Sequence, residues 1–293
     1  MKEIQTENNI GSILRMAGAM LIFGTIGIFR RFIPLSSSLL ACIRGIIGAL
    51  FLLCIVFFRK KDSALKTDRK AGISFIISGC LIGLNWMFLF EAYRYTTVGI
   101  ATLCYYMQPT IVLLLSPVIF HEKLTAKKLV CALIAAAGMF LVSSNDIQGG
   151  NFKGILFGLA AACLYAGVVI FNKKAPPADA YEKTVLQLFS AGLVLLPYIL
   201  LTEGFTFPQL DLTSFLLLMT VCIVHTGIAY VMYFSCMAGL KAQTIAVMGY
   251  IDPVSALFLS ALILHESLTP VALCGAVLII FGALSAELQE SRV

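Results

Sequence analysis

Two His-Glu pairs at a fixed spacing are the first feature of this sequence that could do chemistry. They occur in HEKLT at 121–125 and in HESLT at 265–269. A zinc-dependent protease needs a second histidine four residues after the first, and that position holds threonine in both copies. Threonine is a helix N-cap residue, so each pair is predicted to be a turn between two helices. Glu122 and Glu266 are expected just ahead of those helix starts, where the helix dipole favours negative charge.

Ionisable residues within long apolar segments are the next candidates. Asp252 lies near the middle of one segment and is followed by Pro253, and Gln108 and Pro109 take the equivalent places in another. A proline in a helix interior frees the carbonyl four residues earlier, which for Pro253 is that of Gly249. Two broken helices at matching positions favour a binding site, with Asp252 binding substrate or carrying a proton. The alternative is that both prolines only kink helices for packing.

Arg44 and His225 also lie inside apolar segments. Arg44 must face a partner or water, and the candidates are a salt bridge to Asp252 or Glu91, or a substrate carboxylate. His225 would respond to a changing environment, or it is a hydrogen-bonded core residue. Glu91 and Arg94 stand three residues apart and are predicted to form an ion pair near a segment end.

Aromatic residues gather at the same depths as these charges. They are Trp86, Tyr105, Tyr106, Tyr165, Tyr230, Tyr233 and Tyr250. Tyrosine and tryptophan offer a ring face and a hydrogen bond, which suits amino-acid-like, aromatic or cationic ligands. Others of this set would pack or lie in the interfacial belt. Asn85, beside Trp86, is a further candidate polar contact.

The elements that carry these residues are membrane-spanning helices. Hydrophobic residues make up 60% of the 293 residues and charged ones 12%, and the mean hydropathy of +0.96 exceeds that of soluble domains. Apolar blocks of about twenty residues match the ~30 Å hydrocarbon layer. The fold class is therefore an all-α polytopic membrane protein with ten transmembrane helices. The blocks lie at 12–31, 36–58, 71–92, 96–120, 126–144, 152–173, 182–202, 212–236, 240–264 and 270–287.

The distribution of Lys and Arg predicts the orientation, because cytoplasmic loops retain positive charge. With the N-terminus inside, sixteen of the 21 basic residues lie on the cytoplasmic side and one, Arg44, lies within a span. The outer side holds Arg30, Arg31, Arg94 and Lys153. Both termini are thus predicted to be cytoplasmic, in a plasma (bacterial inner) membrane. The net charge of +6 reflects this bias and requires no nucleic-acid partner.

The nine cysteines give no sign of a cofactor or metal site. They lie mostly within apolar blocks and form no CxxC pair. Single buried thiols usually pack as small hydrophobic groups. We therefore expect no disulfide, no metal cage and no cofactor.

An internal repeat organises the chain. Residues 106–138 align with 250–282 without a gap and are identical at thirteen of 33 positions, and 23–31 weakly resembles 165–173. The chain is predicted to be a duplicated five-helix unit, with its halves at 12–144 and 152–287. Five helices are an odd number, so the second unit enters the membrane inverted. Inverted repeats are typical of secondary transporters, whose substrate site lies where the halves meet.

Several segments of the chain are similar to those of a known family. They are FG at 23–24, LLACIRGIIGALFLL at 39–53, FLFEAYRYTTVGIATL at 88–103, TGIAYVMYFSCMAGL at 226–240, and the two proline-bearing spans that end in HEKLT and HESLT. In these segments the chain resembles the EamA-type members of the drug/metabolite transporter superfamily. The resemblance implies two five-helix EamA units over about residues 12 to 287. It also implies transport of small metabolites, since the family includes amino-acid exporters as well as uptake systems.

These observations predict a secondary transporter for small polar or amphipathic solutes that works by alternating access. The central cavity is expected to be surrounded by Arg44, Tyr106, Gln108, Pro109, His225, Tyr250, Asp252 and Pro253, with Asn85, Trp86, Tyr165 and Tyr230 as further contacts. The expected partners are the lipid bilayer, a small-molecule substrate and a proton as coupling ion, with export of an amino acid or a related amphipathic solute favoured. Uptake of an amine or other small metabolite, a membrane-embedded enzyme, and a passive channel or signalling scaffold are the alternatives.

Overall fold

All the secondary-structure elements in the described part of the computed structural model are helices. The structure describes residues 2–59, 68–121, 125–148, 152–176, 178–203, 209–237 and 248–290. Its elements are α1 (Lys2–Arg31), α2 (Ser37–Arg59), α3 (Arg69–Tyr95), α4 (Val98–Tyr105), α5 (Gln108–Ile119), α6 (Ala126–Gln148), α7 (Phe152–Lys174), α8 (Ala180–Leu193), α9 (Leu196–Thr202), α10 (Leu212–Thr220), the π-helix η1 (Val221–Ile228), α11 (Ala229–Met237), α13 (Ile251–Ile263) and α14 (Pro270–Glu290). The prediction of an all-α protein is confirmed for these residues.

Seven stretches of the described chain are long and apolar enough to cross a membrane. They are Gly11–Arg31, Ser37–Phe58, Arg69–Tyr95, Val98–Ile119, Phe152–Lys174, Tyr181–Thr202 and Leu212–Tyr233. Shorter apolar helices at Leu129–Leu141, Ile251–Ile263 and Pro270–Gly282 fall within the other three predicted spans. The chain is a multi-pass membrane protein, and the count of ten full spans stays a prediction.

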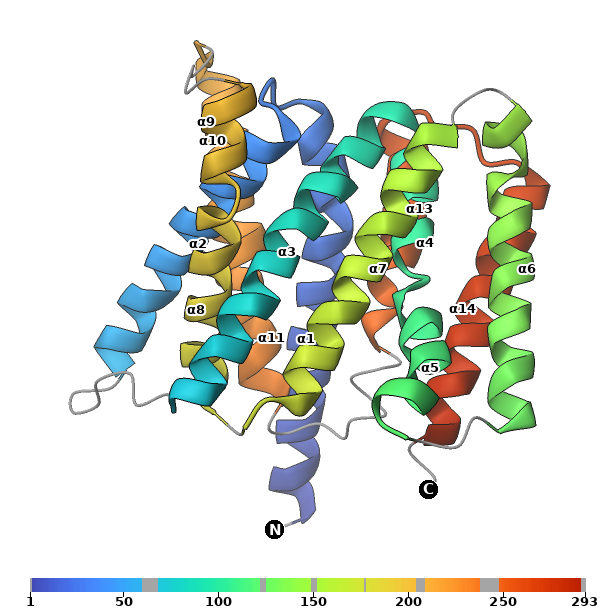
Figure 1. Cartoon of the computed structure of the whole chain (residues 1–293), viewed down its shortest axis with the longest axis horizontal. Helices are drawn as coiled ribbons and strands as arrows, with labels where there is room; N and C mark the ends of the chain where they lie inside the picture. The colour runs from blue at the N-terminus through green and yellow to red at the C-terminus, as the bar shows by residue number, and fades with distance from the viewer. Residues whose placement is uncertain are drawn as a thin grey trace.

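The two halves of the chain begin in opposite directions. In Figure 1, α1 rises from the lower end of the bundle to the upper end, whereas α7 descends from the upper end to the lower one. The start of α1 and the end of α14 lie at the same lower end. Two five-helix units produce this arrangement when the second is inverted relative to the first.

Helix contacts between the halves occur in matching pairs. α1 packs against α13 and α11, and in the other half α7 packs against α4, α5 and α3. The contact of α2 with η1 is matched in the same way by that of α3 with α8. Two further contacts, of α2 with α8 and of α6 with α14, join helices that hold the same place in each half. An approximate twofold axis therefore relates the two halves.

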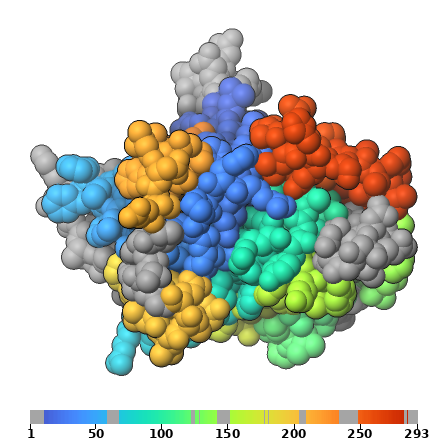
Figure 2. All heavy atoms as spheres, turned by 90° about the horizontal axis from the view of Figure 1, so that it is seen from above, coloured from blue at the N-terminus to red at the C-terminus, as the bar shows by residue number. Residues whose placement is uncertain are grey.

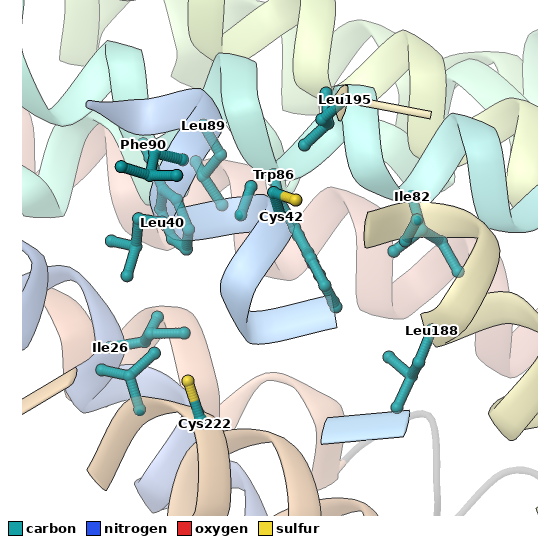
Figure 3. Close-up of a cluster of buried hydrophobic side chains, with 14 of the residues drawn as sticks. Ile26, Leu40, Cys42, Ile82, Trp86, Leu89, Phe90, Leu188, Leu195 and Cys222 are labelled. Atoms are coloured by element: carbon teal, nitrogen blue, oxygen red, sulfur yellow. The ribbon is translucent and has the colours of Figure 1, made fainter. Parts of the chain in front are cut away.

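The largest apolar cluster draws side chains from both halves. Figure 3 shows Leu40 of α2, Leu188 of α8 and Cys222 of η1 as members of one buried cluster. Since lipid is as apolar as these side chains, close packing must hold the helices together. Gly45 and Gly192 permit it between α2 and α8, because a Cβ at Gly45 would lie 2.7 Å from the Gly192 backbone nitrogen.

Side-chain caps fix several helix starts. Thr97 Oγ1 accepts from the third backbone N–H of α4, Asp211 caps α10 through Ser214 N, and Thr269 Oγ1 accepts from Ala272 N at 3.1 Å at the start of α14. Each cap satisfies a backbone donor that has no partner within its own helix. The threonine of HESLT is thus an N-cap, as its sequence predicts.

The upper end of the bundle is where three connections meet. Figure 2 looks onto this end, and there the α1–α2 connection (blue), the α3–α4 junction (teal-green) and the segment between α13 and α14 (red-orange) adjoin. The first two belong to the first half of the chain and the third to the second half. The halves therefore contact each other at this end as well as in the bundle centre.

Candidate functional site: a cavity between the two halves

The two proline-bearing segments are both interrupted. α4 ends at Tyr105 and α5 begins at Gln108 after a turn, so that Pro109 lies in the first turn of α5. α13 likewise begins at Ile251 and holds Pro253 in its first turn. We expected prolines in helix interiors, and the structure places them at helix starts instead. Proline is tolerated there because an N–H in the first turn has no helical partner.

Tyr106 joins the two interrupted segments. Its hydroxyl donates to Asp252 Oδ2 at 2.7 Å and lies 3.3 Å from the carbonyl oxygen of Gly249, the carbonyl that the sequence predicts to be free. The Tyr106 ring centroid lies 6.2 Å from that of Tyr250, its equivalent in the second half. Contact between equivalent residues indicates that the twofold axis passes close to this point.

A cavity of about 480 Å³ lies beside this junction and is bounded by both halves. Nine of the twelve predicted residues line it: Arg44, Trp86, Tyr106, Gln108, Pro109, Tyr165, Tyr230, Tyr250 and Asp252. Its other lining residues are Met16, Met20, Phe23, Gly24, Ile26, Leu89, Phe90, Tyr93, Thr102, Tyr105, Tyr233, Gly249 and Ala256. Cavities of several hundred Å³ with few polar groups suit small organic ligands.

Arg44 faces this cavity and has no carboxylate partner among the described residues. Its guanidinium carbon lies 3.9 Å from the centroid of the Trp86 ring, and its Nε donates to Thr226 Oγ1 at 2.8 Å. The salt bridge considered from the sequence, to Asp252 or to Glu91, is not formed in this structure. The stacking on Trp86 and the hydrogen bond to Thr226 orient the guanidinium away from both of these carboxylates. Arg44 is 4% exposed, so its charge is held away from lipid and bulk water.

The contact of Thr226 with Arg44 could not be predicted from the sequence. Thr226 lies in the π-helix η1, where its own hydroxyl donates to the carbonyl oxygen of Val221, five residues back, at 3.0 Å. π-helical turns are rare and frequently mark functional sites. A local π-turn leaves no signal in the hydrophobic periodicity of a mostly apolar stretch, so only the three-dimensional structure reveals it.

Asp252 supplies the negative charge of the cavity. It lies in the first turn of α13, where backbone N–H groups and the helix dipole favour a carboxylate. The described lining of the cavity thus includes one cation and one anion, which are not paired with each other. Such a pair can bind the two ends of a zwitterionic ligand, because each charge gains a partner when the ligand enters.

Aromatic rings form much of the remaining wall. Tyr105 contacts both Tyr106 and Tyr165 edge to face, with centroids 5.5 and 5.6 Å apart, and Phe23 contacts Tyr230 at 5.4 Å. We predicted most of these tyrosines as candidates, but not Phe23. Phe23, like the lining methionines of α1, looks like ordinary lipid-facing sequence, and only the packing of α1 against α13 turns it inward.

Asn85, His225 and Pro253, three predicted site residues, do not line the cavity. Asn85 is fully buried and donates from Nδ2 to the Ala161 carbonyl at 2.6 Å between α3 and α7. His225 Nε2 lies 2.8 Å from Thr25 Oγ1, and its ring is edge to face with another aromatic ring. The structure therefore places His225 and Asn85 as hydrogen-bonded core residues, because their helix faces point at neighbouring helices.

The charges of the cavity break the symmetry of the repeat. Asp252 is the equivalent of Gln108, and Arg44 is the equivalent of Gln187. Gln187 does not reach the cavity; its Nε2 donates to Ser78 Oγ at 2.7 Å and to an asparagine of α7 at 2.8 Å. The helix arrangement is therefore common to both halves, whereas each charged residue of the cavity occurs in one half only.

A model of the EamA-like transporter family matches residues 10–144 and again 152–286. The chain belongs to the EamA-like transporter family. Transporter YxxF of Bacillus subtilis strain 168, named as uncharacterized, is 27% identical over 87% of this chain and 83% of its own length. The "Probable amino-acid metabolite efflux pump" of Salmonella typhimurium is 30% identical over 68% of this chain and 70% of its own. These names point to a membrane transporter and not to an enzyme.

A solved structure supports the fold of this EamA-like transporter. That crystal structure superposes with a TM-score of 0.67 at 19% sequence identity and covers 97% of this chain and 100% of the other. At this identity the likeness concerns the fold alone. The "Protein PecM" of Dickeya dadantii, 31% identical over 72% of this chain and 71% of its own length, is a further relative in sequence.

The histidines of the two His-Glu motifs follow equivalent helices and share one backbone conformation. His121 follows α5 and His265 follows α13, and both have a positive φ, of 57° and 54°. This left-handed conformation ends a helix and is unusual for a residue other than glycine. We expected Glu266 to act on the helix that follows it. It instead accepts from backbone N–H groups of α4 in the other half, whereas Glu122 lies outside the described residues.

The predicted ion pair between Glu91 and Arg94 is present. Arg94 Nη1 donates to the two carboxylate oxygens of Glu91 at 3.0 and 3.1 Å. Glu91 Oε2 also accepts from Ser37 Oγ at 2.7 Å, which ties the start of α2 to α3. Both helices belong to the first half, so this pair stabilises one half by itself.

Proposed function

We propose that this EamA-like transporter is a secondary active transporter that exports a small organic metabolite, an amino acid or a related amphipathic solute, by alternating access. The observation that carries the proposal is the cavity between the halves, in which Arg44 and Asp252 present opposite, mutually unpaired charges. A site at the interface of two repeats can be reached from either end when the halves rock against each other.

The chemistry of the cavity favours a zwitterion with an apolar side chain. Arg44 would bind a carboxylate, Asp252 would bind an ammonium group, and tyrosine rings would contact the side chain. Gln108 adds a buried amide oxygen with no partner among the described residues, which a substrate N–H can satisfy. The similarity to the "Probable amino-acid metabolite efflux pump" of Salmonella typhimurium supports this substrate class and export.

Asp252 is also the proposed coupling group. Its carboxylate accepts from Tyr106, which belongs to the other half, so a change in its charge acts directly on a contact between the halves. A proton and a substrate ammonium group would compete for the same carboxylate. In that exchange, a proton entering from outside displaces the substrate outward, across a plasma membrane in which both chain termini face the cytoplasm.

A second candidate, an uptake carrier for an organic amine, is favoured by one observation. Asp252 lies in a cavity rich in tyrosine, and a carboxylate among aromatic rings is a common way to bind a cation. Arg44 argues against a simple cation, because a second positive charge would repel it. Competition between an amino acid and its decarboxylated amine separates the two candidates.

Counterflow in proteoliposomes tests the main proposal. Vesicles loaded with an unlabelled amino acid should accumulate the labelled one, and an imposed pH gradient should drive its movement. Asp252→Asn should abolish the response to pH and weaken binding. Unchanged proton-driven transport in this variant would remove Asp252 from the mechanism, and flux without counterflow would indicate a channel.

Asp211→Asn is the matched control for this experiment. Asp211 is also a carboxylate at a helix start, and hydrogen bonds from Ser214 lower its pKa, but it lies outside the cavity. Asparagine is as good an N-cap as aspartate, so the same substitution should leave transport unchanged. A loss in both variants would mean that the assay reports on folding rather than on the site.

A further inference from the structure

The turn that contains Glu266 connects the two halves of the transporter at the upper end of the bundle. Glu266 Oε1 accepts from Val98 N at 2.9 Å and Oε2 from Gly99 N at 3.4 Å. Arg31 Nη2 lies 3.4 Å from Glu266 Oε1 and donates to the Thr96 carbonyl at 2.7 Å. One carboxylate from the second half thus joins α1 and α4 of the first. Its side chain is only 10% exposed.

The contacts of Glu266 complete the N-terminus of α4. The first two N–H groups of that helix, of Val98 and Gly99, are donated to the glutamate, and the third, of Ile100, to Thr97 Oγ1. If Glu266 moved away, two backbone donors and the positive end of the helix dipole would lose their acceptor. The connection therefore resists separation of α4 from the α13–α14 turn.

A second hollow, of about 420 Å³, lies at this same end of the bundle. Arg31, Thr96, Leu264 and Glu266 are among the residues that line it. It shares no lining residue with the central cavity. Figure 2 shows the surface at this end, where the segments that carry these residues adjoin.

Three helical segments run from the central cavity to this second hollow, and each contributes lining residues to both spaces. On α1, Gly24 lines the cavity and Arg31 the hollow; on α4 and the residues before it, Thr102 and Thr96 do so. On α13 and beyond it, Ala256 lines the cavity and Leu264 and Glu266 the hollow. Seven residues of helix rise by roughly 10 Å, so one thin layer separates the two spaces.

Close contacts fill that layer. A Cβ at Gly27 of α1 would lie 2.4 Å from Val98 Cγ1, and one at Gly99 of α4 would lie 2.7 Å from Leu257 Cδ1 of α13. The three helices are thus packed too tightly to pass a solute in this conformation. A solute can pass only when α4 and α13 separate, and that movement must break the contacts of Glu266.

We propose that Glu266, held by Arg31 and by the backbone N–H groups of Val98 and Gly99, is the latch of a gate between the central cavity and the second hollow. The inference rests on the proposed alternating-access function and adds the residue that closes this end. Breaking the latch favours the conformation in which the cavity opens to the hollow. Glu266 acts through the position of α4 and touches no substrate in the central cavity.

Trp86 provides a readout that needs no substrate. It is the one tryptophan of the chain and lines the central cavity. The protein is reconstituted in vesicles, and iodide, which does not cross membranes, is added outside. Proteolysis of a tag on the N-terminus, which lies at the opposite end of the bundle from the latch, gives the fraction of molecules whose latch faces outward.

Glu266→Gln should increase iodide quenching of Trp86 in the latch-outward molecules. Loss of one hydrogen bond to a charged group corresponds to about a tenfold change in the ratio of open to closed molecules. Glu91→Gln is the matched control, because Glu91 pairs with Arg94 at the same end but within one half. Arg31→Gln, which weakens the latch and leaves the glutamate in place, should give a smaller increase. If Glu266→Gln does not fold, the quenching measured in Arg31→Gln tests the proposal.

Quenching that stays at the wild-type level in both latch variants would overturn the proposal. An equal increase in Glu91→Gln would overturn it too, since the effect would then belong to any charge at this end. A latch that responds while counterflow is absent would leave the gate standing and refute the transport mechanism. Counterflow without increased quenching in the latch variants would support the transport mechanism and refute the gate.

Discussion

Replacing Arg44 with glutamine should separate folding from binding in this transporter. The second half carries Gln187 at the equivalent position, so glutamine fits the frame. Burial of one charged group in a membrane protein costs about 2.5–3.5 kcal/mol on insertion scales. Arg44 recovers roughly 2 kcal/mol by stacking on Trp86 and about 1.5–3 kcal/mol from its bond to Thr226. The recovered sum exceeds the cost by about 0–2.5 kcal/mol, so Arg44→Gln should lower the free energy of unfolding by about 2.5 kcal/mol at most.

Binding should respond differently, because a substrate carboxylate would lose its charged donor. One hydrogen bond to a charged group is worth about 1.5–3 kcal/mol, so Kd for an amino acid should rise about tenfold to a hundredfold. Binding of the corresponding amine should not weaken and should become tighter, because the variant lacks the positive charge that repels a cation. Thermal unfolding in detergent measures the stability. The fluorescence of Trp86 measures Kd, because the ring centroid of Trp86 lies 3.9 Å from the guanidinium carbon of Arg44.

Arg44→Lys is the matched variant for the same experiment. Lysine keeps the charge but lacks the planar group that stacks on Trp86 and fixes the direction of the donors, so its Kd should be intermediate. Unfolding of Arg44→Gln at a much lower temperature would show that the charge is structural. Equal affinities for amino acid and amine in wild type and variant would refute the role in binding.

Three further variants test the arrangement of the cavity. Tyr106→Phe leaves Asp252 without its donor from the other half; it should lower the free energy of unfolding by about 1–3 kcal/mol and shift the pH profile of transport, as stopped assays at several pH values would show. Gly45→Val should destabilise the α2–α8 contact by about 1–3 kcal/mol in thermal unfolding, because no space exists for a side chain. His225→Gln should lower the melting temperature but keep the substrate Kd, because His225 lies outside the cavity; a changed Kd would contradict its placement.

Much of the site could be predicted from the sequence because membrane depth follows from position in a span. Asp252, Gln108 and the two prolines are visible as polar or helix-breaking residues in apolar runs, and the repeat shows that they are equivalent. An inverted repeat brings equivalent residues near a common axis, which is why Tyr106 and Tyr250 meet. The proximity of these two tyrosines follows from the symmetry of the repeat and does not depend on how individual side chains pack.

The direction in which each helix face points could not be predicted from depth in the membrane. A step of one residue turns a side chain by about 100°, so neighbours at the same depth face different partners. Asn85 and Trp86 are adjacent, yet Trp86 lines the cavity and Asn85 binds the Ala161 carbonyl between α3 and α7. His225 and Thr226 differ in the same way, and the π-turn that contains them shifts the register further.

The sequence by itself determined the membrane class, the repeat and the depth of the charged residues, because bilayer thickness and the cost of buried charge act on each segment separately. Tertiary structure alone decided which of these residues share a space. It turned Arg44 onto Trp86 rather than toward Asp252, and it gave Glu266 to α4 of the other half. Those choices depend on how helices from two distant halves pack, and the chemistry of one segment does not contain that information.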